Sequence, residues 1–168
     1  MILDPPSWQD AAALFSALLA AALSWRALSA LLARRRRAKW ARRARAISDL
    51  LALSPNEFET ITAAAFEARG WRVEIIGREG RADGGLDLLL FRKGRRFVVQ
   101  CKRYAGKVGA PVVREVIGVM MHHRAQGAFV VGLSGFTRAA QEWAKGKPLR
   151  LIDGQQLLKV LARSRKVN

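Results

Sequence analysis

A long apolar segment near the start of the chain places the strongest constraint on how this sequence can fold. Residues 11 to 33, AAALFSALLAAALSWRALSALLA, contain a single charged side chain, that of Arg26. About 20 apolar residues in a helix are enough to cross the hydrocarbon core of a bilayer. Arg34 to Arg37 follow directly, and basic residues beside a span favour the cytoplasmic side. The segment therefore predicts a membrane anchor whose downstream chain faces the cytoplasm.

Two other interpretations of this segment have different requirements. A secretory signal peptide carries positive charge ahead of its apolar core, whereas the charges here are Asp4 and Asp10, so an uncleaved anchor is favoured. A soluble helix that pairs with another helix stays open, since alanine favours membranes only weakly and Arg26 lies inside the segment. A charge near the centre of a span costs about 2.5 to 3.5 kcal/mol on insertion scales. In that alternative the protein is cytoplasmic.

Positive charge dominates the rest of the chain. The protein has 30 Lys and Arg against 13 Asp and Glu, a net charge of +17. The run from 34 to 45, RRRRAKWARRAR, has no acidic residue, and residues 50 to 168 alone carry 21 basic and 10 acidic residues, a net +11. Such a surface attracts polyanions, either nucleic acid or an anionic lipid leaflet. We expect an anchor at 1 to 33, a basic linker at 34 to 49 and a folded domain at 50 to 168. The linker either has no role beyond following the membrane span or binds lipid head groups or the DNA backbone.

The pattern of the folded domain alternates between helices and strands. Ser54, Pro55 and Glu57 form a capping box that begins a helix, and KG at 93 and 94 joins two strands as a hairpin. Antiparallel strands come first and β-α-β units later, so we expect an α/β fold with a mixed central sheet and helices on both faces. Predicted helices cover 55 to 69, 111 to 126, 136 to 146 and 154 to 163, and predicted strands cover 71 to 76, 86 to 92, 95 to 103, 127 to 133 and 149 to 153.

Three polar side chains interrupt two apolar strands. Asp87 begins LDLLLFR, and Gln100 and Lys102 lie two apart in VVQCKRY, so these two share one face while Cys101 faces the other. In a hairpin the start of one strand lies beside the end of its neighbour, so Asp87 can approach this pair. Glu59, on the helix before the sheet, could add a second carboxylate. Carboxylate and amide oxygens suit Mg²⁺, which polarises phosphoryl oxygens and activates water, and a lysine can stabilise the developing charge.

Several separated stretches resemble one protein family, in the same order along the chain. These stretches are LSPNEFE, GREGRADGGLDLLL, VVQCKRY, VGAPVVREVIGVM, GFTRAAQEWAKG and LRLIDGQQLL. Residues 53 to 161 are thereby similar to the Mrr-type restriction endonuclease domain of the PD-(D/E)xK nuclease superfamily. The resemblance implies a restriction-endonuclease-like three-layer fold and a DNA endonuclease that hydrolyses phosphodiester bonds with Mg²⁺ or Mn²⁺, in DNA restriction or DNA processing. A membrane-tethered nucleic-acid-binding protein with a weak or inactive site is the alternative.

The resemblance also implies roles for individual residues. Asp87 matches the acidic metal ligand at the start of the second core strand, and Lys102 matches the catalytic lysine. Gln100 stands where the wider superfamily has an acid, which resembles the Mrr branch and leaves one less negative charge around the ion. Glu59 resembles the helix glutamate that completes the metal shell, since Glu57 is already used by the capping box.

The residues that flank the motif predict how a DNA substrate is held. We expect Arg103, Lys107 and Arg114 to contact phosphates, which positions DNA without reading its sequence. Asp83, directly before two glycines, is assigned to turn chemistry and not to the metal site. Because cutting two strands usually needs two sites, we also expect a homodimer.

Overall fold

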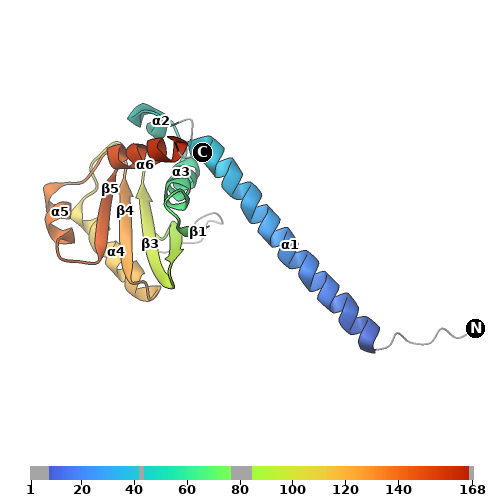
Figure 1. Cartoon of the computed structure of the whole chain (residues 1–168). Helices are drawn as coiled ribbons and strands as arrows, with labels where there is room; N and C mark the ends of the chain where they lie inside the picture. The colour runs from blue at the N-terminus through green and yellow to red at the C-terminus, as the bar shows by residue number, and fades with distance from the viewer. Residues whose placement is uncertain (1–7, 42–43, 77–84, 167–168) are drawn as a thin grey trace, which may run out of the picture. The chain divides into compact units, whose positions relative to one another are not determined.

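The computed structural model describes residues 8–41, 44–76 and 85–166. The chain divides into two units, Met1–Arg36 and Arg37–Asn168, whose elements are labelled in Figure 1. The predicted boundaries after residues 33 and 49 stay predictions. Asp83 and its predicted turn role lie outside the described residues.

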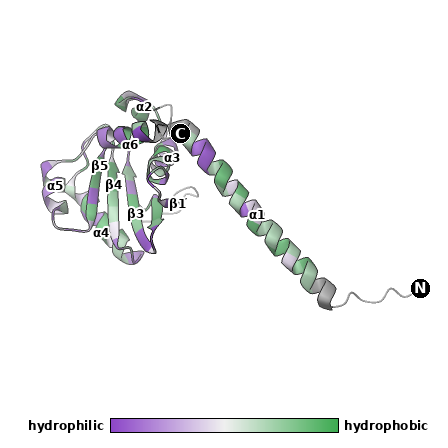
Figure 2. Cartoon of the chain, viewed as in Figure 1, coloured by the Kyte–Doolittle hydropathy of each residue, from purple (hydrophilic) through white to green (hydrophobic). Residues whose placement is uncertain are grey.

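Helix α1 (Trp8–Ala41) confirms the prediction of a long apolar helix at the start of the chain. Its segment Ala12–Ala38 has a mean hydropathy of 1.6 and is not buried within the protein. Leu14, Phe15 and Trp25 leave 65%, 71% and 71% of their surface exposed, and Figure 2 shows apolar residues along most of the helix. The same helix continues into the basic run and ends at Ala41. By length and composition, α1 is able to cross a membrane.

A five-stranded mixed sheet forms the centre of the second unit. Its spatial order is β1-β2-β3-β4-β5. The first two pairings are antiparallel and the last two are parallel, which confirms the prediction. Lys93 and Gly94 join β2 to β3 with φ values of 50° and 73°, as a two-residue hairpin turn of right-twisted strands requires. The strands are β1 (Arg72–Ile75), β2 (Leu88–Arg92), β3 (Arg95–Lys102), β4 (Gly127–Gly132) and β5 (Leu149–Asp153).

Helices cover both faces of this sheet, so the domain has three layers (Figure 1). Alternate residues of β3 serve the two layers: Val99 belongs to the core beneath α2, α3 and α6, and Val98 belongs to the core beneath α4 and α5. The sequence did not predict α2, whose turn is closed by Asp49 accepting hydrogen bonds from the backbone N–H groups of Arg45 and Ala46. The helices are α2 (Ile47–Leu51), α3 (Pro55–Glu67), α4 (Ala110–His122), α5 (Arg138–Ala144) and α6 (Gly154–Lys166).

The start of α3 has the predicted capping box. The hydroxyl of Ser54 accepts a hydrogen bond from the N–H of Glu57 at 3.3 Å, and the N–H of Ser54 donates to the Glu57 carboxylate at 2.7 Å. Both bonds satisfy donors that the first turn of a helix otherwise leaves open. Glu57 is thereby committed to the helix terminus and Glu67 pairs with Arg37, so Glu59 is the remaining acidic residue of α3.

Candidate functional site

The strands β2 and β3 separate at the point where Asp87 lies. Pairing between them ends at Leu88 and Val99, whereas β3 continues to Lys102 beside β4. The N–H of Asp87 still donates to the carbonyl of Val99 at 3.0 Å. Its carboxylate accepts the N–H of Cys101 at 2.5 Å. A carboxylate therefore takes the place of a strand partner and is held at the open end of β3.

Gln100 differs from the other buried polar side chains because both of its polar atoms lack a hydrogen-bond partner in the described residues. Thr62, Glu67 and Gln100 are all buried, with Gln100 only 2% exposed. Glu67 forms an ion pair with Arg37, and the Thr62 hydroxyl lies near the Cys101 thiol but has no hydrogen-bond partner among the described residues. Neither Oε1 nor Nε2 of Gln100 has a hydrogen-bond partner among the residues that the structure describes. Since burying an amide without partners costs free energy, this side chain is poised for a polar ligand.

Gly85 leaves the space into which the Gln100 amide extends. An ideal Cβ at Gly85 would lie 2.1 Å from Nε2 of Gln100 and 3.6 Å from Oε1 of Glu115. The amide and the carboxylate therefore converge on one point, from β3 and from α4. Glu115 was not among the residues predicted from sequence. Its one sequence signal is that it is the single acidic residue in the α4 segment APVVREVIGVMMH.

Electrostatic effects on Asp87 and Cys101 show which other groups lie nearby. Burial raises the pKa of Asp87 above its ordinary value, although the Cys101 N–H and the Lys102 ammonium oppose the change. Burial also raises the pKa of the Cys101 thiol well above its ordinary value, and the carboxylates of Asp87 and Glu59 raise it further. Cys101 packs against the core, as predicted. Glu59, Asp87 and Lys102 are thus all near enough to Cys101 to affect its pKa. Cys101 lies on the face of β3 that packs against α3, the helix of Glu59, whereas Gln100 and Lys102 alternate with it and lie on the face toward α4.

The chemistry of the oxygen atoms near the end of β3 suits a hard divalent cation. The candidate donors are the carboxylates of Glu59, Asp87 and Glu115 and the amide oxygen of Gln100, which has no protein partner in the described part of the chain. Oxygen donors of this kind suit Mg²⁺ or Mn²⁺. In the described residues, no three or more His, Cys, Asp or Glu side chains are grouped as a metal site, so the three carboxylates do not converge on one point in this structure.

The three predicted phosphate contacts differ in their surroundings. Arg103 is half-buried, and its Nη1 donates to the carbonyl of Leu51 at 2.7 Å. Lys107, in the loop after β3, and Arg114, on α4, are both exposed. Arg103 therefore links the end of β3 to α2 through a hydrogen bond. No side-chain hydrogen bond of Lys107 or Arg114 is found in the described contacts.

Comparisons with other proteins concern the family and the fold of this chain. Residues 50–161 match the family model of the Mrr catalytic domain, described as a restriction endonuclease. No curated protein sequence matches this chain. A protein of unknown function, AF1548, is a structural neighbour with a TM-score of 0.52 and 16% identity; the match covers 63% of this chain and 64% of that one.

Two restriction endonucleases are also structural neighbours. The DNA modification-dependent restriction endonuclease AspBHI has a TM-score of 0.55 and 19% identity over 80% of this chain and 36% of its own. MspJI, solved in complex with a 27-mer oligonucleotide, has a TM-score of 0.47 and 22% identity over 66% and 28%. This chain thus spans less than two thirds of each neighbour's length. Because the family model covers more than half of the chain, and the AspBHI match shows the same fold, this chain belongs to the Mrr-type restriction endonuclease family of DNA nucleases.

Proposed function

We propose that this protein is a divalent-metal-dependent DNA endonuclease that hydrolyses phosphodiester bonds at the end of β3. The observation that supports this most strongly is the buried amide of Gln100, which lacks a hydrogen-bond partner among the described residues. It lies at the same strand end as the Asp87 carboxylate. A partnerless amide beside a carboxylate is costly in a protein that binds nothing there, and it is useful in one that binds a cation.

The metal set consists of Glu59, Asp87 and Gln100, with Glu115 as an additional carboxylate. Bound Mg²⁺ or Mn²⁺ supplies polarisation of a phosphoryl oxygen and a more acidic water. The Cys101 N–H holds the Asp87 carboxylate in one orientation. Glu115 lies beside the Gln100 amide, so its negative charge compensates for the neutral residue in the motif.

Lys102 acts on the substrate side of this set. Its ammonium lies near enough to Asp87 to oppose the rise in the pKa of that carboxyl. A cation at this position can hold the attacking water or stabilise the negative charge that develops on the phosphoryl group. Lys107 and Arg114, both exposed, extend the positive surface to neighbouring phosphates, which gives binding without sequence preference.

The membrane tether is the second part of the proposal. The apolar surface of α1 is exposed within the protein, and Arg34 to Arg37 follow at its downstream end. A bilayer would cover the apolar surface of α1, and anionic head groups would attract Arg34 to Arg37. The nuclease domain would then work at the cytoplasmic face of the membrane. The cytoplasmic alternative instead requires a protein partner for α1.

Plasmid nicking tests the catalytic proposal. The full chain in detergent micelles is expected to nick supercoiled DNA with Mg²⁺ and not with EDTA. Asp87→Ala and Lys102→Ala are expected to lose this activity. Glu142→Ala is the matched control, because Glu142 is an exposed residue whose ion pair in the described part of the chain is with Lys145. If the wild type and Asp87→Ala nick DNA at the same rate, the catalytic proposal is wrong, and the alternative of an inactive DNA-binding protein remains if both bind DNA.

A homodimer on DNA completes the proposal, because one site cleaves one strand at a time. Sedimentation of Asp87→Ala bound to a short duplex measures the stoichiometry without cleavage. Two chains per duplex are expected, and a single chain per duplex together with double-strand cleavage by the wild type would contradict the dimer.

A further inference from the structure

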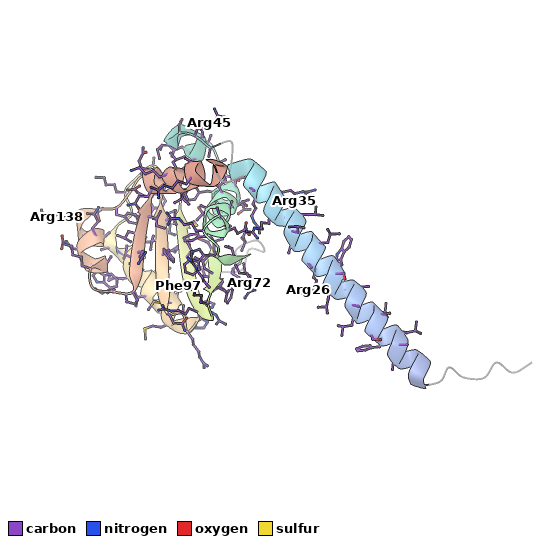
Figure 3. All side chains as sticks on the ribbon, viewed as in Figure 1. Arg26, Arg35, Arg45, Arg72, Phe97 and Arg138 are labelled. Atoms are coloured by element: carbon purple, nitrogen blue, oxygen red, sulfur yellow. The ribbon has the colours of Figure 1, made fainter. Side chains whose placement is uncertain are left out.

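A cavity of about 450 Å³ lies at the opposite end of the sheet from the catalytic group. Phe97, labelled in Figure 3, lines it near the start of β3, whereas Lys102 ends that strand. At about 3.3 Å per residue, these two residues are roughly 16 Å apart along the strand. The volume is within the range of small-molecule sites. The cavity is therefore separate from the proposed metal site and needs its own explanation.

Aromatic rings form one wall of this cavity. Trp71 and Phe97 are both half-buried, and their rings meet edge to face with centroids 5.0 Å apart. Phe129 stands behind them, 6.0 Å from Trp71. Gly127 lets the Phe97 ring lie against the backbone, since a Cβ there would be 2.7 Å from Cε1 of Phe97. The wall is thus held in place by close packing. Because the two rings are nearly perpendicular, at 79°, a planar group can stack on the face of one ring while it contacts the edge of the other.

Cations form the rim. Arg95, Lys147 and Arg150 line the cavity and are exposed. None of the described lining residues is acidic, and the ion pairs of the described chain involve other basic residues. Lys147 donates to the carbonyl of Trp143 at 2.5 Å. The Arg95 guanidinium lies over the Phe97 ring, 5.6 Å from its centroid, and neither Arg95 nor Arg150 donates a side-chain hydrogen bond in the described contacts. Guanidinium groups are well suited to phosphate because they donate two parallel hydrogen bonds.

We propose that this cavity binds a nucleoside phosphate, with the base against Trp71 and Phe97 and the phosphate between Arg95 and Arg150. An apolar ligand would leave the cations without a counter-charge, and a bare phosphate would leave the aromatic wall unused. A nucleotide uses both the aromatic wall and the cations, because bases stack on aromatic side chains and phosphates pair with arginine. The nucleotide can be free or can belong to a DNA strand. This site does not depend on the catalytic proposal, since it shares no residue with it.

Calorimetric titration of the full chain in detergent micelles tests the proposal. Deoxyadenosine 5′-monophosphate, deoxyadenosine and inorganic phosphate are titrated separately in EDTA, which prevents turnover. The monophosphate is expected to bind at least about tenfold more tightly than either fragment. Arg95→Ala and Arg150→Ala are each expected to weaken it by about tenfold. The matched control is Arg138→Ala, an exposed arginine on α5 away from Phe97 in Figure 3.

Three outcomes would overturn the assignment. They are the absence of saturable binding, equal affinity for inorganic phosphate and the monophosphate, and an equal loss in Arg138→Ala, which would indicate general charge attraction. Trp71→Leu adds a test of the base contact, and circular dichroism shows whether that variant folds; if it does not, the two arginine variants decide. A 5′-phosphorylated oligonucleotide that binds through the same arginines identifies a strand as the source, and binding of the mononucleotide alone identifies a free nucleotide.

Discussion

Substituting Gly85 tests whether the position of the Gln100 amide matters for cleavage. An alanine Cβ at Gly85 would lie 2.1 Å from Nε2 of Gln100, against an ordinary contact distance of about 3.5 Å. The amide therefore has to move by more than about 1 Å. Because it is the far end of a flexible side chain, this movement costs little stability, but it takes the proposed ligand oxygen out of position.

The free-energy cost of placing an alanine at this backbone conformation can be separated from the effect of its contact with Gln100. Gly85 has a φ of +85°, and an alanine in this region costs about 1 to 2 kcal/mol. Gly70 has a φ of +82° and has no atom within 4 Å of an added Cβ. Gly70→Ala therefore imposes nearly the same strain without the contact. Both variants should lose roughly 3 to 8 °C of melting temperature, but a misplacement of about 1 Å in a reacting group can reduce the rate by about 100-fold.

Initial rates of plasmid nicking with Mg²⁺, measured below both melting temperatures, distinguish the two variants. Gly85→Ala is expected to be about 100-fold slower than the wild type, and Gly70→Ala is expected to keep the wild-type rate. Cleavage by Gly85→Ala within twofold of Gly70→Ala would refute the reasoning, because the Gln100 amide would then be irrelevant to the reaction.

Three further predictions concern Asp87, Arg103 and α1. Asp87→Asn should abolish cleavage and raise the melting temperature of the metal-free protein at pH 8. Burial raises the pKa of Asp87 in the folded state, so the charged carboxylate destabilises the fold above that pKa. The gain in melting temperature should therefore vanish below about pH 4, where the carboxyl is protonated in the unfolded chain as well. A lower melting temperature of Asp87→Asn at pH 8 would contradict this. Arg103→Ala should destabilise the domain by about 1 kcal/mol, through its lost bond to Leu51. By contrast, Lys107→Ala should keep the melting temperature and reduce the salt dependence of DNA binding; equal melting temperatures for these two variants would argue against the distinction. Removing residues 1–33 should move the protein from the membrane fraction to the soluble fraction, and unchanged partitioning would exclude the anchor.

Local patterns in the sequence were enough to predict most of the fold. The capping box of Ser54 and Glu57 and the Lys93–Gly94 turn depend on residues close together in the chain, so their chemistry could be inferred without a structure. The apolar length of 11 to 33 predicts a helix for the same reason. The two-residue period of a strand placed Gln100 and Lys102 on one face and Cys101 on the other, and it led to the grouping with Asp87.

Contacts between distant elements were decided only by the tertiary structure. Glu115 approaches Gln100 because α4 packs over the end of β3 and Gly85 leaves room for the amide, and neither condition can be seen in local periodicity. Arg103 turns toward the carbonyl of Leu51 on the short helix α2, which the sequence did not predict. The cavity beside Phe97 likewise forms from Trp71, directly before β1, and from β3, β4, β5 and the loops before β4 and β5. Patterns along a chain determine which face a side chain occupies, but what that side chain meets is determined by how helices pack on a sheet.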